Sequence, residues 1–304
     1  MAEVLVTALV LVLIIALGYV VKRISWVSAA DFPMFSRIVL SVTLPCALIT
    51  SFNTFDISPD LLVLALVGVV INLVQQLAGF VVERRRGTQA QAFGVLNVGS
   101  YNIGLFAIPY VSSFLGPASI VHASIFDVGN ALTGAGVGYG WGMSLSRGEA
   151  MVRVGAFVRQ MFKSPVFVTY LTLLIMRLLD LTLPPQVITF TSTVGAANTF
   201  LAMLMIGIGL ELRLTRTKYR SAAKFLGIRY LLSALAALTV WFLTPFDDTV
   251  RTVLCMLFFA PMAAMTAGFT SEAGGDVELS TFMTTASVLV AIVMMPLVFA
   301  LLSA

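Results

Sequence analysis

The residues best suited to bind a small solute lie together within one apolar segment of the chain. Residues 97–104 read Asn-Val-Gly-Ser-Tyr-Asn-Ile-Gly, and a proline follows at position 109. Glycine and proline interrupt a helix, and an interrupted helix offers free main-chain N–H groups that attract anions. The amides and the hydroxyl of the stretch supply further donors and acceptors. The solute-binding residues predicted here are Asn97, Gly99, Ser100, Asn102 and Pro109.

Asp127 is the one acidic residue that falls well inside an apolar segment, and Asn130 follows three residues later on the same helical face. An ionisable residue near the bilayer centre costs at least ~2.5–3.5 kcal/mol. Substrate coordination, a proton-carrying carboxyl and a cation ligand are three functional interpretations of this pair. The structural alternative is a hydrogen bond to an interrupted helix.

Other polar or helix-breaking positions are weaker candidates. Gln75 and Gln76 form a polar stripe with Asn72, and their amides either take part in coupling or gating or bond neighbouring helices together. Pro45 is expected to kink its segment, where a hinge and simple packing are equally open. Arg229 could attract an anion, but the favoured interpretation is that its head group extends to the membrane surface.

The elements that carry these residues are expected to be membrane-spanning helices. Of the 304 residues, 59% are hydrophobic and only 11% are charged, and the mean hydropathy is +1.01. A soluble domain carries about 25% charged residues to cover its surface, so the outer surface of this chain must face lipid. The pI near 9.3 does not indicate nucleic acid as a partner, because the basic residues fall in short loops beside apolar segments.

Residue types that typify enzymes or metal centres are not arranged for such chemistry in this sequence. The two cysteines, Cys46 and Cys255, lie far apart within apolar runs, and no His, Cys, Asp and Glu spacing fits a metal site. A Ser/His/Asp set and paired intramembrane carboxylates are also missing. The sequence therefore predicts no catalytic residues, no metal and no cofactor.

Ten apolar segments are long enough to cross a bilayer, which takes roughly 20 residues. The segments are 3–21, 34–52, 60–82, 91–114, 118–143, 165–183, 187–211, 222–244, 250–270 and 280–303. The first is expected to be a retained helix, because Lys22 and Arg23 follow its apolar run, whereas positive charge precedes that of a signal peptide. The predicted fold class is an all-α integral membrane protein.

Basic and acidic residues alternate from loop to loop over the first eight loops, whereas the ninth contains Glu272, Asp276 and Glu278 and no basic residue. The basic loops contain Lys22 and Arg23, then Arg84, Arg85 and Arg86, then Arg147, Arg153, Arg159 and Lys163, then Arg213, Arg216, Lys218, Arg220 and Lys224. The intervening loops contain Asp56 and Asp60, then Asp180, then Asp247 and Asp248. Because Lys and Arg are retained on the cytoplasmic side, we expect the odd-numbered loops inside the cell and both termini outside, in the cell membrane.

The longest basic loop, 144–164, is expected to be a cytoplasmic linker between two sets of five segments, 1–143 and 165–304. An odd number of segments in each half makes the second half enter the membrane from the opposite side, which is the topology of an inverted repeat. The fourth and ninth segments are equivalent by position, and both are interrupted, the ninth by Pro261 and Gly268. Paired interruptions of this kind indicate the midplane site of a secondary transporter.

These motifs resemble those of the auxin efflux carrier family, including its bacterial malate/malonate-type permeases. The resemblance rests on Leu44-Pro45-Cys46-Ala47-Leu48-Ile49, on residues 97–109, on Asp127 to Asn130, and on the Pro261 region with its following Gly-Gly-Asp loop. It extends over essentially the whole chain. It implies the fold of bile-acid sodium symporters, with ten helices, two inverted five-helix repeats and a crossing of helices four and nine.

The resemblance also implies a scaffold of helices one, two, six and seven that moves against a core of helices three to five and eight to ten. Asn97, Asn102 and Pro109 would line the crossing from one side and Pro261 from the other. One departure is that residues 260–264, Ala-Pro-Met-Ala-Ala, contain none of the acidic and amide sodium ligands of bile-acid symporters. This departure argues against sodium coupling at that site.

The leading hypothesis is a secondary transporter that moves a small organic anion, a mono- or dicarboxylate, by alternating access. The alternatives are a sodium- or proton-coupled carrier similar to bile-acid symporters, and an ion exchanger or channel with Asp127 as the ion site. The expected partners are the substrate anion and membrane lipid. The sequence leaves open the coupling ion, the direction of flux and the formation of a homodimer.

Overall fold

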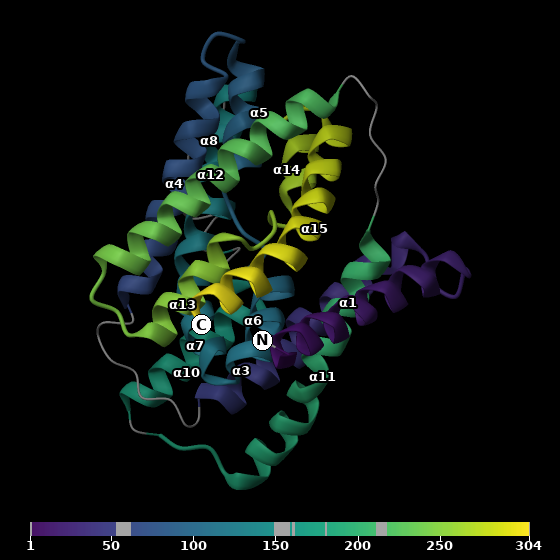
Figure 1. The fold of residues 1–304 in the computed structure, drawn as a ribbon, viewed down its shortest axis with the longest axis vertical. Helices are drawn as coiled ribbons and strands as arrows, with labels where there is room; N and C mark the ends of the chain where they lie inside the picture. The colour runs from purple at the N-terminus through teal and green to yellow at the C-terminus, as the bar shows by residue number, and fades with distance from the viewer. Residues whose placement is uncertain are drawn as a thin grey trace.

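The computed structural model describes residues 2–52, 62–148, 159, 162–179, 181–210 and 218–303, and the regular elements in this part of the chain are helices (Figure 1). The first half contains α1 (Ala2–Arg23), α2 (Phe32–Ile38), α3 (Leu44–Phe52), α4 (Leu62–Val82), α5 (Thr88–Val98), α6 (Ile108–Leu115), α7 (Ala118–Ala131) and α8 (Tyr139–Arg147). The second half contains α10 (Pro165–Leu178), α11 (Pro185–Gly209), α12 (Tyr219–Leu243), α13 (Asp248–Phe258), α14 (Thr266–Glu272) and α15 (Val277–Leu302). Wider π-helical turns continue three of them, η2 (Val39–Thr43), η4 (Ile103–Ala107) and η5 (Leu132–Gly138), and a short 3-10 turn, η1 (Ala29–Asp31), precedes α2.

Six of the described helices are long and apolar enough to cross a membrane. They are Glu3–Arg23, Ala29–Phe52, Leu62–Val82, Pro185–Gly209, Tyr219–Leu243 and Val277–Leu302. Shorter apolar helices cover Ile103–Leu115 and Pro165–Met176. The all-helical integral membrane class is confirmed, while the ten crossings and the inverted repeats stay predictions. Most of the predicted linker lies outside the described residues, as do Asp56, Asp60, Asp180, Arg153, Arg213 and Arg216.

Large apolar side chains cover the outside of the helices. Leu5 on α1 is 67% exposed, Leu66 on α4 is 58% exposed, and Leu243 at the end of α12 is 78% exposed. Soluble proteins rarely expose contiguous apolar patches, because apolar side chains are unfavourable in water. Lipid solvates such side chains, so the exposed apolar faces fit a protein surrounded by a bilayer.

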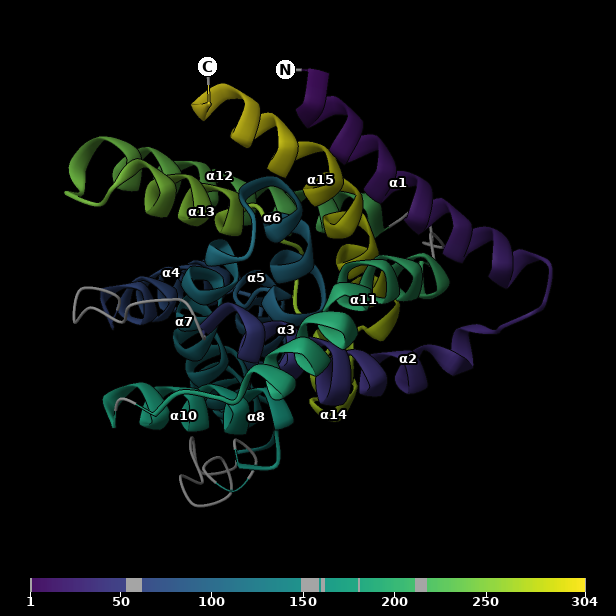
Figure 2. The ribbon, with the colours of Figure 1, turned by 90° about the horizontal axis from the view of Figure 1, so that it is seen from below.

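Two groups of helices pack mainly among themselves. In the first, α1 and α3 pack against α11, and α10 packs against α3. In the second, α4 packs against α5, α7 and α12, while α13 and α14 pack against α15. Figure 2 shows α1, α2 and α11 on one side of the molecule and α4, α12 and α13 on the other. We call α1, α2, α3, α10 and α11 the α1–α11 group. We call α4, α5, α7, α12, α13, α14 and α15 the α4–α15 group.

Glycines allow very close helix contacts within the α4–α15 group. A Cβ on Gly79 of α4 would lie 2.2 Å from the carbonyl oxygen of Gly94 on α5, and a Cβ on Gly94 would lie 2.3 Å from the carbonyl oxygen of Gly79. Small residues let membrane helices approach in this way. The contact fixes α5, and with it the start of the interrupted fourth segment, against α4.

We expect Gly94→Ala to lower the melting temperature of the detergent-purified protein, because the added methyl must push α4 and α5 apart. Overpacking of this kind costs about 1–3 kcal/mol. The matched control is Gly227→Ala on α12, where a Cβ meets no atom within 4 Å, and which should leave the melting temperature unchanged or raise it. Equal melting temperatures for Gly94→Ala and the wild type would contradict the close contact.

Both segments are interrupted as predicted, but Gly268 lies inside the helix α14, so its predicted part in the second interruption is wrong. The fourth segment consists of α5 and the helix Ile103–Leu115, and residues 99–102 between them are unwound. The ninth segment consists of α13 and α14, which ends at Glu272, and residues 259–265 between them are irregular. The break after α5 includes Ser100 at a φ of 65°, which is unusual for a residue other than glycine.

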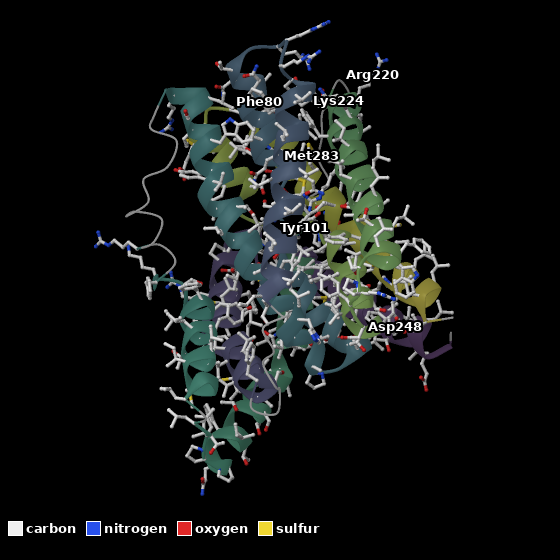
Figure 3. All side chains as sticks on the ribbon, turned by 90° about the vertical axis from the view of Figure 1, so that its left-hand side faces the viewer. Phe80, Tyr101, Arg220, Lys224, Asp248 and Met283 are labelled. Atoms are coloured by element: carbon white, nitrogen blue, oxygen red, sulfur yellow. The ribbon has the colours of Figure 1, made fainter. Side chains whose placement is uncertain are left out.

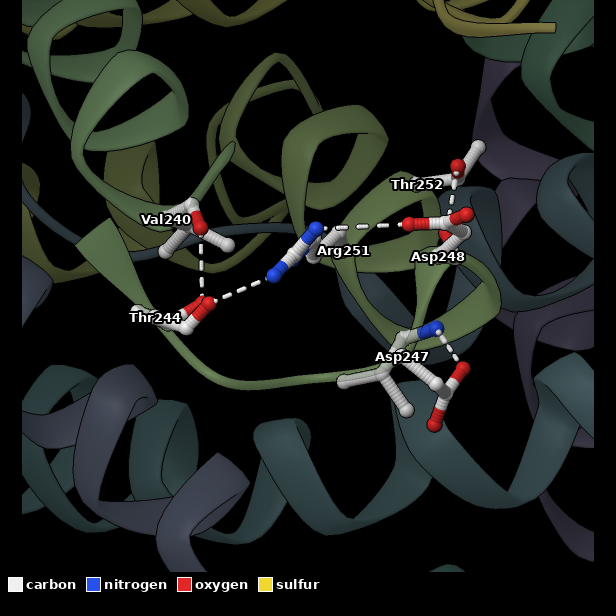
Figure 4. A network of polar contacts seen from close by, with 7 residues as sticks. Val240, Thr244, Asp247, Asp248, Arg251 and Thr252 are labelled. Carbon is white, nitrogen blue, oxygen red and sulfur yellow. Dashed lines mark hydrogen bonds and ion pairs between the residues drawn. The ribbon is translucent and has the colours of Figure 1, made fainter. Parts of the chain in front are cut away.

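Polar contacts fix the start of the ninth segment (Figure 4). Asp247 caps α13 by accepting a hydrogen bond from the Val250 N–H at 3.0 Å. Arg251 donates to the Thr244 carbonyl at 2.7 Å and pairs with Asp248 at 3.3 Å. These contacts tie the start of α13 to the end of α12, so the two helices form a rigid hairpin that directs α13 toward the interruption.

The opposite end of the molecule carries basic residues. Figure 3 shows Arg220 and Lys224 at this end, Asp248 far from it, and Tyr101 between them. Lys218 donates to Asp276 at 2.8 Å and to Glu278 at 2.6 Å, and these hydrogen bonds raise the pKa of its ammonium group. The pairs hold the start of α15 against the start of α12.

Candidate functional site

The two unwound stretches cross and bond to each other. Tyr101 and Met262 form an isolated antiparallel β-bridge, and the Asn102 N–H donates to the Pro261 carbonyl at 2.8 Å. Unwound main chain at membrane depth must find partners inside the protein, because lipid supplies none. The crossing therefore satisfies part of the main chain of each interruption with the other.

Two asparagine side chains hold the first interruption in place. The Asn130 amide oxygen accepts from the Tyr101 N–H at 2.8 Å, and its nitrogen donates to the Tyr101 carbonyl at 3.0 Å. The Asn72 amide oxygen accepts from the Ser100 N–H, and its nitrogen donates to Asn130 at 3.2 Å. These side chains replace the main-chain hydrogen bonds that a continuous helix would make.

Arg229 is a buried part of the crossing, so the interpretation that its head group extends to the membrane surface is wrong. Its side chain is 0% exposed. The guanidinium donates to the Val98 carbonyl at 2.7 Å and to the Ala260 carbonyl at 3.3 Å, and its carbon lies 4.3 Å from the centre of the Tyr101 ring. The carboxyl ends of the interrupted helices and the aromatic face are both electronegative, and they offset the desolvation that would otherwise drive the side chain outward.

The adjacent glutamines support this arrangement from α4. Gln75 is fully buried, and its amide donates to the Tyr101 hydroxyl at 2.8 Å and to Ser233 at 3.3 Å. Gln76 donates to the Thr133 carbonyl at 3.0 Å. Gln75 thus orients the ring that Arg229 faces, and Gln76 joins α4 to the π-helical turn η5.

Two cavities adjoin the crossing. The first cavity has a volume of about 220 Å³ and lies between α7, α10 and the two interruptions. Its polar lining residues include Ser100, Asn102, Asp127, Asn130 and Tyr170. The second cavity has a volume of about 350 Å³, and the described residues that line it come from α2, α11, α14, α15 and the crossing, including Thr281, Thr284 and Thr285.

Asn102 lines both cavities. It precedes the helix Ile103–Leu115, yet its side chain does not cap that helix. The amide of this side chain makes no hydrogen bond to any described residue. Ile103, Gly104 and Leu105, at the amino end of this helix, also line the first cavity. A free amide and the positive end of a helix dipole therefore face the same space, which is an arrangement that binds anions.

Asp127 adds a carboxylate to the first cavity. One of its oxygens accepts from the Asn130 amide at 2.8 Å. The other faces Gly104, where a Cβ would lie 3.9 Å from it. Neither cavity has a Lys or Arg side chain among its described lining residues, so Asp127 has no basic partner in this space.

Asn97 and Pro109, two other predicted site residues, are not among the described lining residues of either cavity. Asn97 is 0% exposed and joins α5 to α14 and α15, because its amide donates to Thr270 at 2.9 Å and accepts from Ser280 at 2.6 Å. Pro109 is buried, and its carbonyl accepts from Ser113 at 2.9 Å and from Thr199 of α11 at 3.4 Å. Both residues join helices around the site.

The remaining predicted residues are Gly99, Pro45 and Pro261. Gly99 packs against Gln76, whose Cγ would lie 2.6 Å from an added Cβ. Pro45 is buried near the start of α3, directly after the π-helical turn η2. Pro261 bonds to Asn102 within the crossing. The structure therefore brings together Ser100, Asn102, Asp127 and Asn130 in the first cavity and places the remaining candidates around it.

The sequence did not predict the position of Tyr170 or the contacts of Arg229. Tyr170 on α10 lines the first cavity together with Asp127. A single tyrosine in an apolar segment gives no signal of this role. The position of Arg229 well inside α12 was such a signal, since a side chain so far from the helix ends cannot easily reach the membrane surface.

Two family models and a relative match this chain. The family model described as membrane transport protein matches residues 3–152, and the model described as sodium bile acid symporter family matches residues 198–304. A transporter of uncharacterised function from Methanothermobacter thermautotrophicus is 25% identical over 296 residues, which cover 96% of each chain. The chain is thus similar to membrane transport proteins over residues 3–152 and to the sodium bile acid symporter family over residues 198–304. These matches confirm the resemblance inferred from the motifs.

The two family models match different halves of the chain, and each matched range contains one of the interrupted segments. The matches to transporter families agree with the apolar helices of the structure. They specify neither a substrate nor a coupling ion, so these must be inferred from the residues around the crossing.

Proposed function

We propose that the chain is a secondary transporter that moves a small organic anion, a mono- or dicarboxylate, across the cell membrane by alternating access. The observation that carries the proposal is the free amide of Asn102, which lies between two cavities at the amino end of the helix Ile103–Leu115. A carboxylate bound there would accept hydrogen bonds from the amide and be attracted by the helix dipole.

The proposed topology has ten crossings, arranged as two inverted repeats of five with both termini outside. The equivalent positions of the two interruptions and the match of one family model to each half support it. The α1–α11 group would form the scaffold, and the α4–α15 group, which contains the crossing, would move against it. Asn102 lies where the groups meet, because the second cavity is lined by both.

The test of the proposed function is uptake into proteoliposomes of five radiolabelled acids: pyruvate, L-lactate, malonate, L-malate and indole-3-acetate. Uptake of at least one acid should saturate and be inhibited by its unlabelled form. Absence of saturable uptake for all five would contradict the proposal. A voltage-driven cation current without such uptake would favour the second candidate, an ion channel or exchanger, for which Asp127 without a basic partner in its cavity is the specific observation.

Asn102→Ala is expected to reduce the uptake of a transported acid at low concentration about 10- to 100-fold. Hydrogen bonds to a charged group contribute about 1.5–3 kcal/mol, and each 1.4 kcal/mol is a factor of ten. The matched control is Asn198→Ala on α11, whose amide bonds to Thr43 and lines neither cavity. The KM of the control should match the wild type, and wild-type uptake by Asn102→Ala would remove Asn102 from the site.

The topology is tested by single cysteines in a protein whose buried Cys46 and Cys255 are replaced by serine. Ala118→Cys should react with a membrane-impermeant maleimide on intact cells, because the loop before α7 is expected outside. Arg86→Cys should react only after the cells are permeabilised. Both positions are exposed in the structure, so a reversed pattern of labelling would overturn the orientation.

A further inference from the structure

Two ionisable side chains lie at the level of the crossing, within the α4–α15 group. Arg229 on α12 is fully buried, and its hydrogen-bond acceptors are the carbonyls of Val98 and Ala260. Asp127 on α7 lines the first cavity and accepts one hydrogen bond, from Asn130. The two side chains are not bonded to each other. They contribute one positive and one negative charge to the same packed unit.

The sum of these charges changes when an anion binds. With Asp127 ionised, the empty unit is neutral, because Asp127 balances Arg229. A bound monocarboxylate would add a negative charge beside Asp127, in a cavity without a basic side chain among its described lining residues. Enclosing an unbalanced charge in an apolar environment costs several kcal/mol even after relaxation, and two adjacent carboxylates repel each other.

We propose that Asp127 binds one proton from water each time a substrate anion binds, and releases it with the substrate on the other side. This inference rests on the proposed function, and it names the coupling ion. The proton converts the Asp127 carboxylate to a neutral acid, so Arg229 then balances the substrate carboxylate. With a monocarboxylate bound, the packed unit therefore has the same net charge as the empty unit.

The geometry makes Asp127 the suitable proton carrier. Its free oxygen faces Gly104, in the amino-terminal turn of the helix at which the substrate carboxylate would bind. Other titratable or charged side chains lie near Asp127, on α7, on the elements packed against α7 or in the lining of the first cavity. They are Cys46, Tyr101, Tyr110, His122, Tyr170, Asp248, Arg251 and Cys255. Asp248 and Arg251 pair with each other at the start of α13. Asp127 is thus the carboxylate of this set that lines the first cavity.

The stoichiometry follows from the single carboxyl group. A monocarboxylate would move with one proton and carry no net charge across the membrane. A dicarboxylate would also move with one proton and would carry one negative charge. Membrane potential should therefore affect the uptake of malonate or L-malate and leave that of pyruvate or L-lactate unchanged.

The experiment uses sodium-free proteoliposomes and whichever of the five acids shows the fastest saturable uptake. For the wild type, a gradient of one pH unit, acid outside, should support about tenfold accumulation at one proton per monocarboxylate. A pH dye inside the vesicles should report proton entry that begins when the acid is added. Protein-free liposomes correct for diffusion of the undissociated acid.

Asp127→Asn assigns the proton to this residue. The neutral amide mimics the protonated form, so the ratio of accumulation with and without the gradient should fall from about ten to one, while exchange of labelled for unlabelled acid stays measurable. A variant that still responds to the gradient, or a folded variant that has lost all exchange, would overturn the assignment. Acid uptake by the wild type without proton entry, or with a sodium requirement, would overturn proton coupling but leave the proposed function intact.

Discussion

Arg229→Met should reduce uptake of a transported acid at least about 100-fold and lower the melting temperature. Methionine replaces the apolar stem of the arginine but lacks the guanidinium, so the Val98 and Ala260 carbonyls would be left without this partner. A buried unsatisfied group costs about 1–3 kcal/mol, or about 2–6 kcal/mol for the two. Removing a buried cation offsets part of this loss of stability, so the melting temperature should fall only modestly while uptake falls strongly. Both are measured on purified protein, before and after reconstitution.

The control for this prediction is Arg220→Met, an exposed position at the start of the same helix (Figure 3). It should leave uptake and melting temperature unchanged. Arg229→Lys keeps the charge but loses the forked geometry that reaches two carbonyls, so its uptake should be intermediate. Full uptake by Arg229→Met would show that the crossing is held without this residue.

Asn130→Ala is expected to abolish measurable uptake and to destabilise the protein by about 2–6 kcal/mol, because it leaves the N–H and the carbonyl of Tyr101 without partners. Asp127 would lose its described hydrogen bond as well. The first interruption would then lack the side chain that fixes its direction. Uptake assays and thermal unfolding in detergent measure the two effects.

Thr133→Ala is the matched control for Asn130. Thr133 is also buried and lies one turn later, but its hydroxyl bonds to the carbonyls of Gly129 and Asn130 in its own helical stretch. Its loss should change neither uptake nor stability by a large factor. If the Asn130 and Thr133 variants behave alike, the amide does not hold the interruption.

The helical segments were predictable because their signals are local. Long apolar runs mark the helices, and the predicted segments 187–211, 222–244 and 280–303 differ from α11, α12 and α15 by at most three residues at each end. Gly and Pro act on their own stretch of main chain, so the two interruptions were also visible. The interruption of the ninth segment was predicted, but its extent, residues 259–265, depends on contacts with other parts of the fold.

The contents of the site were harder to predict, because they depend on how distant segments meet. Asn97 and Asn102 have the same side chain and lie in one motif, yet the first joins helices and the second faces both cavities. The difference arises from the unwound residues between them, which redirect the chain. Arg229 is retained inside because Val98 and Ala260, from the two halves of the chain, present carbonyls to it. No local sequence pattern predicts that these two carbonyls lie close together.

The bridge between Tyr101 and Met262 has a consequence for how the protein is made. During synthesis the first interruption enters the membrane well before the residues that pair with it, since Pro261 and Met262 lie in the second half. Until then the Asn102 N–H has no main-chain partner, and lipid cannot replace one. The first half should therefore be a poor substrate for independent assembly and a good target for quality-control proteases, whereas the two halves produced together as separate polypeptides should protect each other.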